Sequence, residues 1–222
     1  MVNIQAYHQL LEEISPRKVK LVAVSKFKTV EHIQKLYDAG QKDFGENYVQ
    51  ELVDKQTKLP QDIQWHFIGH LQSNKVKYIA PFVYLIHGVD SVKLLKEIQK
   101  QAAKNNRVIP VLLQVYIAME ESKFGFDDQE LAACLDELMT NPLPNIQVVG
   151  LMGMASFSED QNQVKGEMQH LKKLYDYHYA KLGVLEGLDK PILSMGMSGD
   201  YPLAIDEGSN MIRVGSLLFG AR

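Results

Sequence analysis

The sequence contains very little cysteine and no surplus of positive charge. Its 222 residues include one cysteine, Cys134, so no disulfide can form within the chain, and a reducing cytosol is the expected compartment. Cys134 lies in a stretch with helical spacing, where we expect a small buried core residue rather than a nucleophile. The formal net charge is −3, which argues against nucleic acid or an anionic membrane surface as the main partner.

Long apolar runs and a recognisable export signal are also missing. No stretch approaches the roughly 20 apolar residues that a membrane-spanning helix needs. The first residues carry glutamate and histidine where a secretory signal needs an apolar run. We therefore expect a cytoplasmic protein with no membrane partner. Hydrophobic residues make up 45 % of the chain, which is enough to build a substantial core.

The chain alternates short apolar runs with amphipathic segments. A helix is expected around residues 3–14, and Ser91 and either Asp127 or Asp128 are expected N-caps of later helices. The short runs have the composition of strands buried on both faces, because they are rich in valine, isoleucine and leucine. They lie at residues 19–25, 43–47, 65–70, 82–88, 109–117, 146–154, 191–197 and 211–216.

Eight strand-and-helix repeats predict an α/β fold in which a parallel sheet closes into a (β/α)8 TIM barrel. An open doubly wound sheet has the same alternation. The count of eight and the lack of an early Gly-x-Gly-x-x-Gly turn favour the barrel. No linker rich in proline, glycine or serine divides the chain, so residues 1–222 are expected to form a single barrel domain with an extra N-terminal helix.

Polar residues are expected to gather at one rim of this barrel. Active sites of such barrels form at the C-terminal ends of the strands, so the residues at the expected strand ends are candidate functional groups. In chain order these ends carry Ser25 and Lys26, Glu46 and Asn47, His70, His87, Met152 and Met154, Met197 to Asp200, and Arg213 to Ser216.

The turns after the seventh and eighth strands have the composition of an anion site. Ser198 lies in a run of small residues, and Gly215 and Ser216 follow the last strand, where backbone N–H groups can approach a phosphate closely. The glycines would equally allow tight turns without a ligand. Their occurrence at both positions where barrels often bind phosphate favours the anion site.

Lys26 would lie across the barrel mouth from that anion site. A partly desolvated lysine on a rigid strand end can form a Schiff base with a carbonyl compound. A phosphorylated carbonyl compound could be the cofactor pyridoxal 5′-phosphate (PLP) or the sugar phosphate of an aldolase. Arg213 decides weakly between them, since it could face the pyridine nitrogen of PLP, neutralise another anion, or pair with Glu46 or Asp206 inside the barrel.

The chain also contains the longer motifs LVAVSK, FGENYVQEL, WHFIGHLQSNKVK, HGVDS, ESKFGF, GLMGM, SMGMSGD and IRVGSLLFG. Over nearly the whole chain these motifs resemble the YggS/PROSC family of pyridoxal phosphate homeostasis proteins. The resemblance implies PLP as the cofactor and a barrel similar to that of alanine racemase, which is fold type III among PLP proteins. It further implies that Lys26 holds PLP as a Schiff base and that Ser198, Gly215 and Ser216 bind its phosphate.

The remaining matched residues are also assigned roles by this resemblance. Asn47 would line the cofactor pocket. Arg213 would lie near the pyridine nitrogen and keep it unprotonated, which weakens PLP as an electron sink. Met197 and His70 lie on matched segments and are further candidate contacts. No metal site is expected, and no residue is assigned a catalytic role.

Some positions depart from the family pattern. Phe27 and Thr29 stand where threonine and proline are usual, Tyr116 where asparagine is usual, and Asn210 where threonine is usual. We expect Phe27 and Tyr116 to reshape the pocket mouth and Asn210 to change a phosphate contact. None of these departures removes a proposed ligand.

The resemblance implies a protein of intracellular PLP homeostasis that affects amino-acid and keto-acid balance, with PLP-dependent apoenzymes as recipients of PLP. The alternative is an amino-acid racemase-like enzyme. Racemases of this fold resemble a barrel plus a β domain, whereas eight strands use the whole chain here. Racemisation also needs two acid–base groups, and Lys26 alone is evident, with Tyr48 as a weaker candidate. We therefore expect no robust catalysis, and a monomer, because no wide apolar patch is visible.

Overall fold

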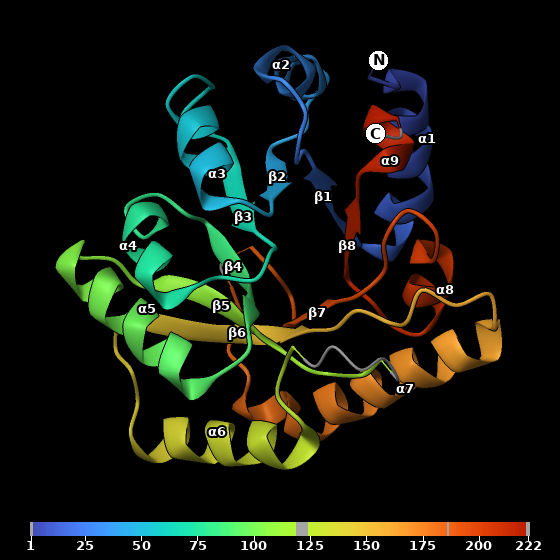
Figure 1. The fold of residues 1–222 in the computed structure, drawn as a ribbon. Coiled ribbons are helices and arrows are strands. Elements are labelled where there is room, and N and C mark those ends of the chain that lie inside the picture. The colour runs from blue at the N-terminus through green and yellow to red at the C-terminus, as the bar shows by residue number, and fades with distance from the viewer. Residues whose placement is uncertain (1, 119–123, 186, 221–222) are drawn as a thin grey trace.

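Eight parallel strands close into a barrel in the computed structural model, which describes residues 2–118, 124–185 and 187–220 (Figure 1). Neighbouring strands pair in chain order, and the last strand pairs with the first, so the predicted (β/α)8 barrel is confirmed. The strands are β1 (Lys20–Val24), β2 (Asp43–Glu46), β3 (Gln64–Phe67), β4 (Leu85–Val89), β5 (Ile109–Gln114), β6 (Ile146–Met152), β7 (Ile192–Ser194) and β8 (Met211–Val214).

Helices lie outside the strands, and the expected N-terminal helix is present. It packs beside the last helix, where the Asn3 N–H donates to the Leu218 carbonyl oxygen at 2.8 Å (Figure 1). No described helix is long and apolar enough to cross a membrane. The helices are α1 (Ile4–Ile14), α2 (Val30–Asp38), α3 (Val49–Gln56), α4 (Val76–Ile79), α5 (Val92–Lys104), α6 (Asp128–Thr140), α7 (Gln161–His178), α8 (Tyr201–Asp206) and α9 (Ser216–Phe219).

The expected caps begin α5 and α6. The Ser91 hydroxyl accepts the Leu94 N–H, and the Asp127 carboxylate accepts the N–H groups of Gln129 and Glu130. Asp127 is therefore the N-cap of α6, in a capping box with Glu130, which settles the choice between Asp127 and Asp128. Cys134 of the same helix is buried as predicted, and burial raises the pKa of its thiol to about 11.

Strand residues alternate between two apolar layers. One face packs under the helices, as Leu21 and Ala23 of β1 do, while Val22 between them points into the barrel. The interior layer is small and made of aliphatic side chains and methionine. Its buried members are Val22, Leu85, Leu112, Val149, Met152, Leu185, Ile192 and Met211.

A chain of polar side chains from β1 to β4 also lies in the barrel. Lys20 Nζ and His66 Nε2 contact the same oxygen of Asp43, at 2.8 and 2.9 Å, and His66 Nδ1 lies 2.8 Å from His87 Nε2. Because a carboxylate only accepts, His66 Nε2 carries the proton, so His66 Nδ1 accepts from His87 Nε2. The Nδ1 of His87 is then a buried acceptor, and no hydrogen-bond partner for it occurs among the described residues.

The sequence led us to expect His87 at the pocket rim, but the structure does not place it there. It lies within β4, fully buried, because its parity along the strand directs it into the barrel. Burial lowers the pKa of His66 although the Asp43 carboxylate opposes this effect. Burial also holds the pKa of His87 well below its ordinary value, and the nearby positive charges of Arg213 and Lys20 act in the same direction. His87 is therefore neutral in the folded protein at pH 7.

Acid should destabilise the fold through His87. An unfolded histidine takes up a proton near pH 6.5, whereas folded His87 does not, so each pH unit below that value costs up to about 1.4 kcal/mol. The variant His87→Gln keeps a donor for His66. Between pH 7.5 and pH 5.5, we expect its free energy of unfolding to fall by about 1.4 kcal/mol less than that of the parent. Urea unfolding at both pH values measures this. His8→Gln, at an exposed position of α1, is the control, and equal losses in parent and His87→Gln would contradict the prediction.

Candidate functional site

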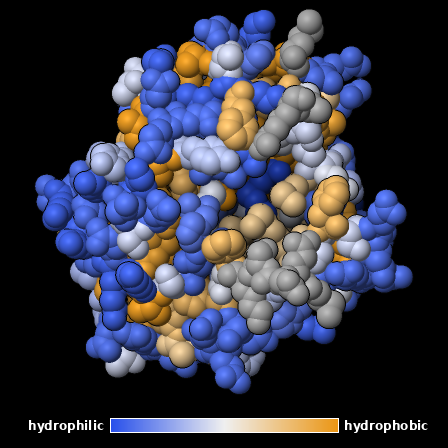
Figure 2. All heavy atoms as spheres, in the orientation of Figure 1, coloured by the Kyte–Doolittle hydropathy of each residue, from blue (hydrophilic) through white to orange (hydrophobic). Residues whose placement is uncertain are grey.

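The two-residue period of β1 continues past the strand and orients Lys26. Val24 and Lys26 line a cavity, whereas Ser25 between them points outward and donates to Glu46 Oε1 at 2.6 Å. The cavity lies at the C-terminal ends of the strands and has a volume of about 490 Å³, within the range of small-molecule sites. Figure 2 shows a hollow with a strongly hydrophilic floor bordered by hydrophobic side chains.

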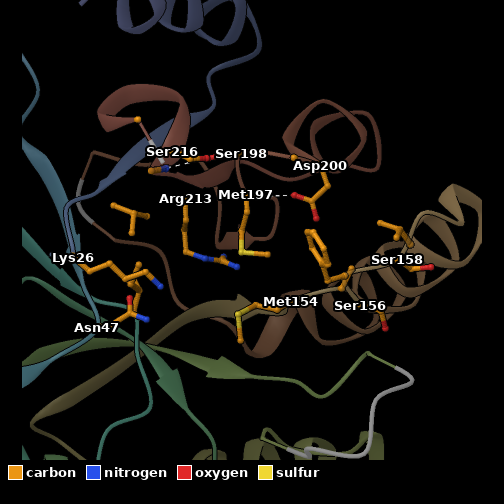
Figure 3. Close-up of a pocket in the computed structure, with 18 of the residues that line it drawn as sticks. Lys26, Asn47, Met154, Ser156, Ser158, Met197, Ser198, Asp200, Arg213 and Ser216 are labelled. Carbon is orange, nitrogen blue, oxygen red and sulfur yellow. Dashed lines mark hydrogen bonds between the residues drawn. The ribbon is translucent and has the colours of Figure 1, made fainter. Parts of the chain in front are cut away.

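This cavity gathers most of the residues predicted from the sequence (Figure 3). They come from strands that are far apart along the chain, since β1 and β2 provide one side and β7 and β8 the other. The predicted residues on its wall are Lys26, Asn47, Met197, Ser198, Arg213, Gly215 and Ser216.

Further expected rim residues lie elsewhere, and Met152 is buried in the interior layer of the barrel. His70 is not on the cavity wall: its side chain is 51 % exposed, hydrogen-bonds Asp90 at 3.1 Å and packs beside the Phe124 ring. Glu46 is fully buried on the outer side of the barrel, where it bonds Lys55 of α3. Glu46 was expected at the mouth with Asn47. Neighbouring residues of a strand point to opposite faces, so Glu46 points outward where Asn47 points toward the cavity.

Arg213 is a buried cation on the cavity wall. One guanidinium nitrogen donates to Ser194 Oγ at 2.6 Å and another to the Gly153 carbonyl oxygen at 3.1 Å. Within the described part of the chain no carboxylate lies at ion-pair distance, so pairing with Glu46 or Asp206 does not occur. Burial lowers the pKa of Arg213 to about 10, and the group remains charged at pH 7.

The turns after β7 and β8 meet and form a cradle with anion-binding chemistry. The Gly215 N–H donates to Ser198 Oγ at 3.1 Å, which leaves the hydroxyl proton of Ser198 to donate to a ligand. The first N–H groups of α9, which begins at Ser216, have no intrahelical acceptor. A Cβ at Gly215 would lie 3.2 Å from the Val24 carbonyl oxygen, so a side chain there would press on β1.

Asn47 lies on the opposite side of the cavity, where the turn after β3 passes close to its backbone. A Cβ at Gly69 would lie 2.4 Å from the Asn47 carbonyl oxygen, so only glycine lets the turn after β3 pass this close. Asn47 Oδ1 is buried, and no hydrogen-bond partner for it is found in the described ranges. A buried acceptor that has no protein partner and belongs to a residue on the cavity wall is suited to bind a ligand.

Sequence reasoning placed Met154 at the rim but missed the rest of a wall formed by the loop between β6 and α7. Its serines are held by the helix, since the Ser156 N–H and hydroxyl donate to Glu167 at 2.7 and 2.8 Å. The motif GLMGM preceded this loop, but nothing in the loop itself suggested a site. Its lining residues are Met154, Ala155, Ser156, Phe157 and Ser158.

The departures from the family pattern lie at different ends of the barrel. The exposed Phe27 ring lies 5.2 Å from the Tyr48 ring, beside Lys26. Asn210 lies before β8, where its side chain accepts the Leu193 N–H and donates to the Pro191 carbonyl oxygen. Asn210 therefore joins the starts of β7 and β8, and the expected phosphate contact is wrong.

The family model for the alanine racemase N-terminal domain matches residues 2–222. The chain belongs to this family. A pyridoxal phosphate homeostasis protein of Aquifex aeolicus is 42 % identical over 91 % of this chain and 87 % of its own length. The human protein of the same name is 38 % identical, over 96 % of this chain and 78 % of its own. The resemblance to the YggS/PROSC family is thereby confirmed.

Solved structures agree with the barrel. PipY of Synechococcus elongatus, solved with PLP bound, is 34 % identical with a TM-score of 0.85, and the match covers 98 % of this chain and 99 % of PipY. Alanine racemase of Streptomyces coelicolor is 14 % identical with a TM-score of 0.80, and the match covers 99 % of this chain and 58 % of the racemase. The latter likeness concerns the fold alone.

Removal of the orphaned Asn47 acceptor should stabilise the protein when no ligand is present. A buried acceptor without a partner costs about 1–3 kcal/mol, and leucine has a similar shape without that cost. We expect Asn47→Leu to raise the free energy of unfolding by about 1 kcal/mol in urea titrations. The control Asn74→Leu, at an exposed position, should change it by less than about 0.5 kcal/mol. A destabilised Asn47→Leu protein would contradict the prediction.

Proposed function

We propose that this protein binds PLP in the cavity at the C-terminal ends of the strands and takes part in PLP homeostasis. The observation that carries the proposal is that Lys26 shares one cavity with the cradle of Ser198, Gly215 and Ser216. An amine and an anion cradle are the two groups that a phosphorylated aldehyde requires. The PLP found in PipY and the name of the relatives support the same ligand.

In this proposal each side of the cavity holds one part of PLP. The Lys26 amine would hold the aldehyde of PLP as a Schiff base, with loss of water. The Ser198 hydroxyl and the N–H groups at the start of α9 bind the phosphate. Asn47 Oδ1, a buried acceptor, provides a contact for a polar group on the ring, and Met197 contributes apolar wall.

The charge of Arg213 favours storage of PLP over catalytic turnover. PLP supplies carbanion stabilisation when its pyridine nitrogen is protonated. A fully buried guanidinium that faces the ring nitrogen would oppose that proton, because two positive charges in a dry site repel each other. The ring would then be a poor electron sink, which suits a protein that holds the aldehyde without consuming it.

The proposal extends to the use of the bound PLP. We propose that the protein acts as a monomer in the cytoplasm and releases PLP to apoenzymes that depend on it. It would thereby affect amino-acid and keto-acid balance. Binding in the cavity shields the aldehyde from amines elsewhere in the cell. Reversible binding would therefore protect the cofactor and limit unwanted reactions of its aldehyde with other molecules.

Lys26→Ala should abolish the Schiff base. We expect the purified parent to show the Schiff-base absorption band with PLP, and the variant to lack it and to bind PLP at least about tenfold more weakly, since the covalent bond is lost. Borohydride reduction followed by peptide mapping should place PLP on Lys26 in the parent. Lys58→Ala, which removes an exposed lysine paired with Asp54, is the matched control. An unchanged band in Lys26→Ala would disprove the assignment.

The storage role has its own test. The parent with PLP is incubated with single L-amino acids in deuterium oxide, and deuterium at Cα is measured by NMR. We expect no multiple turnover, because in this proposal Arg213 would oppose protonation of the ring nitrogen and no second acid–base group is assigned. Sustained exchange would support the racemase-like alternative instead.

A further inference from the structure

Lys55 of α3 is a buried lysine outside the cavity. The residue is 4 % exposed, and lysine is rarely buried unless its charge is paired. Its ammonium donates to Glu46 Oε1 at 2.7 Å, to Glu51 Oε1 at 2.6 Å and to the Ser25 carbonyl oxygen at 2.8 Å. All three of its protons are therefore used.

Each of these three acceptors is tied to the backbone that carries Lys26. Ser25 directly precedes it, and the Ser25 hydroxyl donates to the same Glu46 oxygen at 2.6 Å. On the C-terminal side of Lys26, Glu51 Oε1 accepts the Phe27 N–H at 2.6 Å. The Lys55 ammonium thus bridges the two peptide groups that flank Lys26, and it does so from outside the barrel.

The bridged backbone is strained. Phe27 has a φ of 61°, in the left-handed region, and the Lys28 N–H donates to the Ser25 carbonyl oxygen at 3.0 Å to close a turn over Lys26 and Phe27. A positive φ at the third residue of such a turn is ordinarily taken by glycine. A bulky residue adopts it only where the surroundings hold it, and such strain is concentrated at functional sites.

We propose that Lys55 is a positioning residue for Lys26: through Glu51 and the Ser25 carbonyl it holds the strained turn that directs the Lys26 side chain into the cavity. This inference rests on the proposed function, because its consequence is the capture of PLP by Lys26. The bridge has no contact with the cavity, so its effect on PLP is transmitted through the turn alone.

The electrostatics explain why the bridge needs a lysine. Burial raises the pKa of Glu46 to about 7, and the positive charge of Lys55 opposes that effect. Glu46 Oε2 is buried, with no hydrogen-bond partner among the residues described. Without Lys55, Glu46 and Glu51 would face each other with no counter-charge, and Glu51 would turn toward solvent and release the Phe27 N–H.

The first experiment compares Lys55→Met with Lys58→Met. Lys58 lies three residues further along, and its exposed pair with Asp54 contributes little. We expect Lys55→Met to weaken PLP binding about tenfold and to slow the appearance of the Schiff-base band, while Lys58→Met matches the parent. Unchanged PLP affinity and rate in folded Lys55→Met would overturn the inference.

A second pair of variants separates positioning from general stability. Glycine adopts a positive φ without cost, so Phe27→Gly should keep the turn formed when the bridge is lost. We expect Lys55→Met to cost about threefold or less in PLP affinity in the Phe27→Gly background, with the thermal midpoint still lowered. An equal loss of affinity in both backgrounds would mean that Lys55 acts only through stability, and would overturn the proposal.

Glu51→Ala tests the same bridge if Lys55→Met does not fold. Glu51 is partly exposed, so water can solvate what the substitution leaves behind. The substitution removes the acceptor of the Phe27 N–H together with one of the three acceptors of Lys55. We expect about threefold weaker PLP binding, restored by Phe27→Gly, with Gln50→Ala as the neighbouring exposed control. No loss in Glu51→Ala would contradict the bridge. A parent that binds no PLP would instead refute the proposed function itself.

Discussion

Closure of eight parallel strands decides which side chains reach the cavity. In a closed barrel every strand has one inward and one outward face, and successive residues alternate between them. Lys26 points into the cavity because Ser25 points out, and Asn47 lines it because Glu46 does not. The same alternation gives the site two kinds of residue: inward groups available to a ligand, and outward groups that can hold the inward ones in place through the surrounding helices.

The fold could be predicted from the sequence because buried parallel strands leave apolar runs that need no tertiary information. Helix caps were equally legible, since Asp127 and Ser91 act on N–H groups only a few residues away. The predicted positions of Glu46, His87 and Asn210 were wrong. In each case the exact position along a strand decides which face or end of the barrel the side chain occupies. The Lys55 bridge could not be foreseen, because a lysine with helical spacing has the same pattern whether it faces solvent or three buried oxygens.

Buried charges of both signs surround the cavity, and burial shifts their pKa values in opposite directions. It lowers the pKa of Arg213 and raises that of Glu46, in each case toward the neutral form. Arg213 stays charged because its ordinary pKa is so high, whereas Glu46 depends on Lys55. The barrel therefore holds Arg213 as a buried cation on the cavity wall, whereas Glu46 and Lys55 lie behind that wall and outside the cavity lining.

The seam between β8 and β1 joins the first strand of the barrel to the last. Lys26 follows β1, whereas Arg213 and the start of α9 come from the final residues, and α1 packs on α9. Lys26 and the cradle of Ser198, Gly215 and Ser216 therefore come from opposite ends of the strand order. They meet in one cavity only when β8 pairs with β1 and closes the barrel.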